Sequence, residues 1–264
     1  MKRLLFVGTG YDFPEGAFGF LAAANHHQSC VVVGLFFRPG DSDRVHSVGY
    51  EQDQAIEKNR EIFVRECRRQ LIPCQLHDHE GEWDRELLEE ESRFFDLMLL
   101  SGDLICGETN RGQPNFFLQE ALQRANCPVV VVPELYLEPG CILMPYSDNR
   151  NSLQALKQFC YQLPGLTDLP TEMSCIKDNR TGHVLNPDKF REFAQVHFQS
   201  LSMLESPSHA GGLFEESMRE KGPFLLISGS FSRSALSLIA KRSFAEKAIH
   251  EYAMPVFIAG HGSY

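Results

Sequence analysis

The loop at residues 228–243 combines hydroxyl groups with positive charge, which is the chemistry of an anion-binding segment. Ser230, Ser232 and Ser243 offer hydroxyl donors, and Arg242 offers a guanidinium that pairs with phosphates or carboxylates. A helical pattern begins at the end of this loop, and helix N-termini present unpaired N–H groups to anions. Arg242 can either clamp a phosphate or close the same space with its bulk. The loop therefore marks the candidate binding site of the chain.

The loop at residues 102–112 in the first half carries carboxylates instead. Asp103 and Glu108 stand among Gly102, Gly107 and Gly112. Carboxylates in a confined site repel phosphate oxygens. We expect no triphosphate there, and we expect the three glycines only to shape a surface loop.

Histidines provide the remaining candidate ligands. His77 and His79 alternate at the end of a short apolar run, so their side chains would share one face of a strand. Two imidazoles without a third ligand are more typical of a polar strand terminus than of a metal site. No G-x-S-x-G, H-E-x-x-H or P-loop pattern occurs, and no Ser/His/Asp set can be assigned from spacing. We therefore predict no catalytic residues and no metal ligands.

An internal repeat indicates which elements position these residues. Leu-Leu-Ser-Gly at residues 99–102 recurs as Leu-Ile-Ser-Gly at residues 226–229, and each copy is followed at the same distance by a proline, Pro128 or Pro255, that opens an apolar run. A buried strand, a connection containing one helix and a second buried strand form a βαβ crossover. The chain is thus predicted to be two copies of one α/β unit.

Apolar runs and helical patterns alternate through both copies, which predicts two tandem doubly wound domains with parallel five-stranded sheets. The first domain is expected at residues 1–134 and the second at residues 141–264, and the linker region at residues 133–140 contains two prolines. Ligands of such sheets bind beyond the carboxyl ends of the strands, where the strand order reverses. The loops after the first and fourth strand of each half are therefore the places to look for a site.

Composition narrows the class of protein. The net charge of −10 argues against broad binding to nucleic acid, and no apolar run is long enough to span a bilayer. The eight cysteines are scattered without a C-x-x-C pair, which favours buried reduced thiols over a disulfide framework or a metal cluster. We expect a soluble, cytoplasmic protein that binds neither nucleic acid nor membrane.

The chain resembles the universal stress protein family, whose members carry a G-x2-G-x9-G-[ST] loop, then A-E-K and a C-P-V strand. Residues 229–243, Ala-Glu-Lys at 245–247 and Met-Pro-Val at 254–256 fall in register with that form. The resemblance extends to Cys-Pro-Val at 127–129 and to the strand beginning at residue 142, and so spans nearly the whole chain. It implies the adenine nucleotide alpha hydrolase-like fold of that family, and that the last strands of the two halves pair in an intramolecular pseudo-dimer, with a further homodimer possible.

The resemblance also implies where a nucleotide would bind. In ATP-binding relatives the loop glycines let backbone N–H groups approach the phosphates, yet here Ser232 and Arg242 replace two of them. For that reason we favour closure by Arg242 over a phosphate clamp. The adenine-binding Asp of the family corresponds to Ser147, and Asp148, one residue later, is a weak substitute that more readily supports the turn into the next helix.

Three functions remain open at this stage. The first is a stress-response binding or regulatory protein with degenerate or lost ATP binding, no resident cofactor and protein partners of unknown identity. The second is an ATP or AMP binder that uses Gly229, Ser230, Ser232 and Ser243 of the second domain. The third is a weak ATPase, for which the sequence provides no base or metal-ligand set, so we predict that the chain is not an enzyme.

Overall fold

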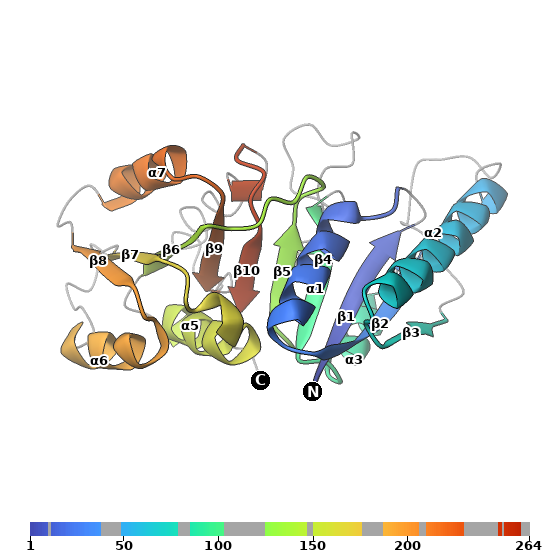
Figure 1. Cartoon of the computed structure of the whole chain (residues 1–264), viewed down its shortest axis with the longest axis horizontal. Coiled ribbons are helices and arrows are strands. Elements are labelled where there is room, and N and C mark those ends of the chain that lie inside the picture. Colours follow the sequence, from blue (N-terminus) through green and yellow to red (C-terminus); the bar gives the residue numbers. More distant parts are fainter. Residues whose placement is uncertain are drawn as a thin grey trace. The chain divides into compact units, whose positions relative to one another are not determined.

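The structure is a computed structural model that describes residues 1–9, 12–37, 49–78, 85–102, 125–146, 150–175, 187–205, 210–229, 248–249 and 251–259. The chain divides into two compact units, Met1–Glu134 and Leu135–Tyr264 (Figure 1). None of the described helices is both long and apolar enough to cross a membrane.

The first unit follows the predicted alternation of strands and helices. Its described elements are β1 (Lys2–Thr9), α1 (Glu15–His27), β2 (Cys30–Phe37), α2 (Gly49–Arg69), β3 (Cys74–His77), α3 (Arg85–Ser92), β4 (Leu97–Ser101) and β5 (Val129–Val132). The strands lie in the order β3-β2-β1-β4-β5, and all neighbours are parallel. Helices α1 and α2 cover one face and α3 lies on the other (Figure 1). Every residue of β4 and β5 is buried, as expected for strands covered on both faces.

The second unit repeats this topology. Its described elements are β6 (Cys141–Tyr146), α5 (Arg150–Gln162), a 3-10 turn (Pro164–Leu166), β7 (Thr171–Cys175), α6 (Pro187–His197), β8 (Leu201–Glu205), α7 (Ala210–Glu220), β9 (Phe224–Gly229) and β10 (Val256–Ala259). The strand order is β10-β9-β6-β7-β8, again parallel throughout. Helices α5 and α6 lie on one side of this sheet and α7 on the opposite side (Figure 1).

The described elements confirm the predicted fold class of parallel five-stranded α/β sheets. Helical patterns in the sequence also predict a helix near residues 116–125 and another at residues 243–252. The first lies almost wholly outside the described residues, and so does most of the second. Ala248 and Ile249 are helical, but residues 251 and 252 form a turn and a bend, so the expected helix end at Tyr252 was wrong. Ala253 has a φ of 51°, and the Met254 N–H donates to the Ala248 carbonyl at 2.7 Å, which shows that the chain turns back here before β10.

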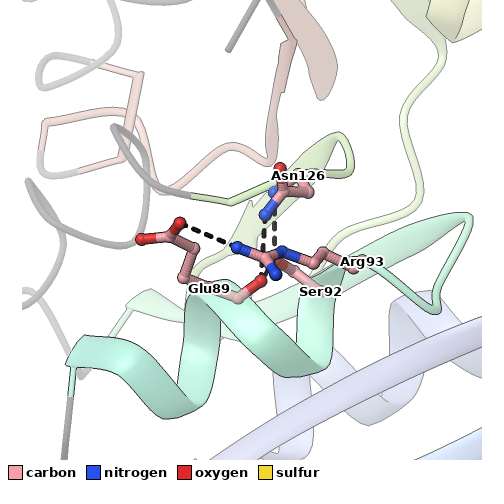
Figure 2. Close-up of polar contacts among 4 residues, drawn as sticks. All are labelled: Glu89, Ser92, Arg93 and Asn126. Carbon is pink, nitrogen blue, oxygen red and sulfur yellow. Dashed lines mark hydrogen bonds and ion pairs between the residues drawn. The ribbon is translucent and has the colours of Figure 1, made fainter. Parts of the chain in front are cut away.

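A polar cluster fixes the C-terminus of α3 to the segment that leads into β5 (Figure 2). The Asn126 side-chain amide donates to the Glu89 carbonyl at 2.9 Å, and the Asn126 N–H donates to Ser92 Oγ at 2.9 Å. Arg93 extends the cluster with a 3.1 Å ion pair to the Glu89 carboxylate. Carbonyls in the last turn of a helix lack intrahelical partners, so this cluster caps the helix. We assign it a structural role.

Candidate functional site

The reversal of strand order falls between β1 and β4 in the first sheet and between β6 and β9 in the second. In the second sheet Cys141 pairs with Phe224 and Leu143 with Leu226. Continuing that register brings Tyr146, the last residue of β6, level with Gly229, the last residue of β9. The strands therefore deliver the chain to one edge of the sheet immediately before the two predicted site segments.

Gly229 is the one residue of the predicted site that the structure describes. Ser147, Asp148, Ser230, Ser232, Arg242 and Ser243 lie outside the described residues, so their roles remain predictions. The described part of the candidate site is the region where the ends of β6 and β9 meet the first turn of α5.

Gly229 lies against the backbone at the start of α5. A Cβ placed on it would meet the Asn151 carbonyl carbon at 3.0 Å, the Asn151 oxygen at 3.1 Å and the Ser152 nitrogen at 3.1 Å. Real Cβ atoms seldom approach backbone atoms so closely, so a larger residue at this position would press on the start of α5. Gly229 and the start of α5 are therefore closely packed.

The side chains beside Gly229 are also turned to internal partners. Ser228 is buried, and its hydroxyl donates to the Gly229 carbonyl at 3.2 Å. Ser152, at the start of α5, is fully buried. The hydroxyls of Ser228 and Ser152 therefore lie in the packed interior and are not available to a ligand.

Two aromatic rings pack together at the end of β6, where α6 covers the sheet. Tyr146 packs against Phe190 of α6, with ring centroids 3.9 Å apart and an interplanar angle of 34°. Both side chains are buried. A planar base that entered along the end of β6 toward β7 would have to displace this pair.

A cluster of phenylalanine rings packs against the middle of β1 in the first unit. Phe6 of β1 contacts Phe13, Phe18, Phe36 and Phe63, with centroid distances from 5.1 to 6.3 Å. All five rings are buried. This cluster occupies the space between β1, β2 and the helices α1 and α2 that cover them.

Glycines of the first unit serve the same close packing. A Cβ on Gly8, near the end of β1, would meet the Phe36 ring at 2.6 Å, and one on Gly16 would meet the Pro133 carbonyl oxygen at 1.9 Å. Gly102, the residue after β4, is similarly close to Pro133, whose Cα lies 3.1 Å from the Cβ position. The loop that carries Asp103 and Glu108 lies outside the described residues, so its expected rejection of triphosphate stays a prediction.

His77 pairs with a carboxylate. Its Nδ1 lies 2.9 Å from Glu91 Oε2 of α3, and its ring meets Phe95 edge-on. His79 lies outside the described residues. Within the described part of the chain, no three His, Cys, Asp or Glu side chains are placed to hold a metal ion.

Two side-chain clusters were not foreseen from the sequence. Buried Glu172 of β7 contacts Ser217 of α7 and Lys221, the residue after α7. Cys67 near the end of α2 lies close to Cys74, the first residue of β3. The first cluster had no signal in the sequence, because the strand Thr-Glu-Met-Ser-Cys at residues 171–175 is too polar to mark Glu172 as buried. The second had none either, because the scattered cysteine spacing matches no motif.

The two doubly wound parallel sheets define the class of protein as α/β. Its fold is that of the universal stress proteins: the chain is similar to a universal stress protein from Archaeoglobus fulgidus DSM 4304, with a TM-score of 0.67 and 13% identity, over 99% of this chain and 97% of that chain. A weaker similarity, with a TM-score of 0.46 and 10% identity over 98% of this chain and 95% of that chain, relates it to the cytoplasmic domain of a prokaryotic cation chloride cotransporter. No protein-family model matches the sequence, and no curated protein does either. At such identities the comparison establishes the fold, and function has to be argued from the site.

Proposed function

We propose that the chain is a universal stress protein-type binding protein that acts in a stress response or its regulation and has lost efficient ATP binding. The observation that carries the proposal is the packing of Gly229 against Asn151 and Ser152. A phosphate cradle in this fold needs space at the strand ends where the strand order reverses. The close approach of Gly229 in β9 to the backbone at the start of α5 supports a reduced space for a phosphate there.

The residue types at other positions of the predicted site support the same proposal. Ser147 stands where ATP-binding relatives place an Asp, and Ser232 and Arg242 replace two loop glycines. The Tyr146–Phe190 pair adds bulk beside the end of β6. Each change removes either a contact to adenine or the close backbone approach to phosphate, so their effects on nucleotide affinity should accumulate.

The alternative is an ATP or AMP binder that uses residues 229–243. The retained Gly229 and the hydroxyls of Ser230 and Ser243 favour it, because three serines and an arginine near a helix start still suit an anion. Arg242 would then contact a phosphate instead of closing the loop.

Isothermal titration of the full chain with ATP and with AMP, each in the presence of Mg²⁺, separates the two functions. We expect no saturable binding by the wild-type protein. The matched variant Ser147→Asp/Ser232→Gly/Arg242→Gly restores the family pattern and should gain measurable affinity for ATP. Micromolar binding by the wild type, weakened by Ser243→Ala, would establish the alternative.

We further propose that β5 and β10 pair within the chain as an intramolecular pseudo-dimer. Each is the outer strand of its own sheet, and pairing would cover two exposed strand edges. A cysteine pair introduced at Val131 and Phe257 should cross-link within one chain if the strands are neighbours.

We place the protein in the cytoplasm, with a second copy or an unidentified protein as its partner. Light scattering after gel filtration tests for the homodimer.

A further inference from the structure

Three thiols gather on one face of the first sheet, under the end of α2. Cys74 opens β3 and pairs with Val32 of β2, while Cys30 precedes Val32 by two residues. Because side chains alternate along a strand, Cys30 and Cys74 emerge on the same face. Helix α2 covers this face, since a Cβ on Gly34 would meet the Phe63 ring at 2.8 Å, and Cys67 lies one turn after Phe63.

A defined turn returns the chain from Cys67 to Cys74. The Ile72 N–H donates to the Cys67 carbonyl at 2.9 Å and the Leu71 N–H donates to the Arg68 carbonyl at 3.2 Å, the bonding pattern of a Schellman motif. Leu71 occupies the left-handed position of that motif with a φ of 55°. The first residue of β3 is thereby set beside the last turn of α2.

The shared face and the turn thus bring Cys67 of α2 beside Cys74 of β3, and both are free thiols. Cys67 is fully buried, whereas Cys74 is half-buried and can meet a small molecule from solvent. Cys30 is buried and its thiol contacts the Asn25 side-chain oxygen at 3.5 Å. The Cys67–Cys74 pair therefore has one accessible thiol, that of Cys74, and one enclosed thiol, that of Cys67.

We propose that Cys67 and Cys74 form a reversible intramolecular disulfide, with a small disulfide such as oxidised glutathione as the oxidant. The Cys74 thiolate attacks one sulfur of the oxidant, which forms a mixed disulfide and releases one glutathione thiolate. Cys67 then attacks Cys74 Sγ, which forms the protein disulfide, and its proton passes to the second glutathione as that thiolate leaves. Two protein thiols are oxidised and one small disulfide is reduced to two thiols, so electrons and atoms balance.

Burial assigns the order of these two attacks. It raises the pKa of the Cys67 thiol far above the ordinary cysteine value, and the neighbouring Cys74 adds to the shift. It also raises the pKa of Cys30 to about 11. A thiol that is rarely ionised and has no access to solvent is a poor first nucleophile. Cys74 is therefore the thiol that reacts first, and Cys67 resolves the mixed disulfide. A transient disulfide of this kind is compatible with a reducing compartment, where such bonds act as sensors.

Mass spectrometry of the folded full-length protein tests the proposal. The protein is treated with oxidised glutathione, alkylated and cut with trypsin, which cleaves after Arg68 and Arg69 between the two cysteines. We expect two peptides joined through Cys67 and Cys74 that separate on reduction. Cys74→Ser should abolish the link, Cys67→Ala should leave a lasting glutathione adduct on Cys74, and Cys30→Ala should keep the link.

Other outcomes overturn the proposal. They are a stable adduct on wild-type Cys74 without cross-linking, a link that includes Cys30, or a Cys67–Cys74 link that forms only in denaturant. Thermal unfolding of each variant verifies that it is folded, and if Cys67→Ala is not, the wild type together with Cys74→Ser and Cys30→Ala decides. The result does not depend on whether the protein binds ATP, so the two proposals fail separately.

Discussion

The Lys221 ammonium lies 2.9 Å from the Glu172 carboxylate and joins the C-terminal end of α7 to β7. Glu172 is only 8% exposed, and it also accepts a 2.5 Å hydrogen bond from Ser217 Oγ. A carboxylate in such a place requires charged or hydrogen-bonding partners. Ser217 belongs to α7 and Lys221 follows directly after it, so the Glu172 side chain fixes the end of this helix to the sheet.

Removing the two charges should have unequal effects. Lys221→Met leaves a buried carboxylate with the Ser217 bond, and we expect a loss of about 2 kcal/mol in the free energy of unfolding. Glu172→Gln frees a lysine that reaches solvent, and we expect a loss of about 1 kcal/mol. Urea unfolding of both variants and of the double variant measures the coupling. Equal and additive losses would contradict a buried-carboxylate account.

The same ion pair predicts a dependence on alkaline pH. The hydrogen bond to Glu172 raises the pKa of Lys221 above its ordinary value of 10.5, against a smaller opposing effect of burial. A raised pKa in the folded state contributes stability that is complete below the unfolded pKa and is lost as pH rises through the folded pKa. The stability difference between wild type and Lys221→Met should therefore be constant near neutral pH and shrink above about pH 11. A difference that instead grows with alkaline pH would refute this assignment.

The strands could be predicted from the sequence because they are buried on both faces. Apolar runs in the sequence predict strands at residues 96–101 and 128–132, and the structure places β4 and β5 within one residue of these limits. The Glu172 cluster could not be predicted in the same way. Its partners lie 45 and 49 residues further along the chain, and no periodicity in the sequence reports which side chains a covering helix brings to a strand.

The candidate site was predictable only in part. Repeat and topology place Gly229 at the end of a strand where the order reverses, and the structure describes it there. Its contact with Asn151 depends on how deeply α5 packs, which the sequence does not encode locally. The approach of Cys74 to the end of α2 likewise depends on the turn at Leu71, where a left-handed leucine replaces the expected glycine.

Alanine at Gly229 should be destabilising without any ligand present. Its Cβ would press on Asn151 and Ser152 backbone atoms that belong to the first turn of α5, so we expect a loss of about 1–3 kcal/mol. Gly222 provides the matched control, because nothing lies within 4 Å of its Cβ position. Gly222→Ala should be neutral or stabilise by about 0.5 kcal/mol. If Gly229→Ala unfolds at the same urea concentration as the wild type, the close packing of Gly229 against the start of α5 is refuted.

The cap on α3 supplies the last prediction (Figure 2). The Asn126 side-chain nitrogen donates to the Glu89 carbonyl, so Asn126→Ala should cost about 1 kcal/mol by leaving that carbonyl without this donor. Asn126→Asp should cost more, because it turns a carboxylate oxygen toward the carbonyl and adds negative charge at a helix C-terminus.

Arg93→Ala is the control for this cap, because it removes only a surface ion pair with Glu89 and should cost at most about 0.5 kcal/mol. Thermal unfolding ranks the three variants. The Asp variant should also recover part of its loss when the pH falls below about 4, where the protonated acid regains a donor for the Glu89 carbonyl. Equal losses for the Ala and Asp variants at neutral pH would mean that the turn before β5, and not the amide donor of Asn126, holds the end of α3.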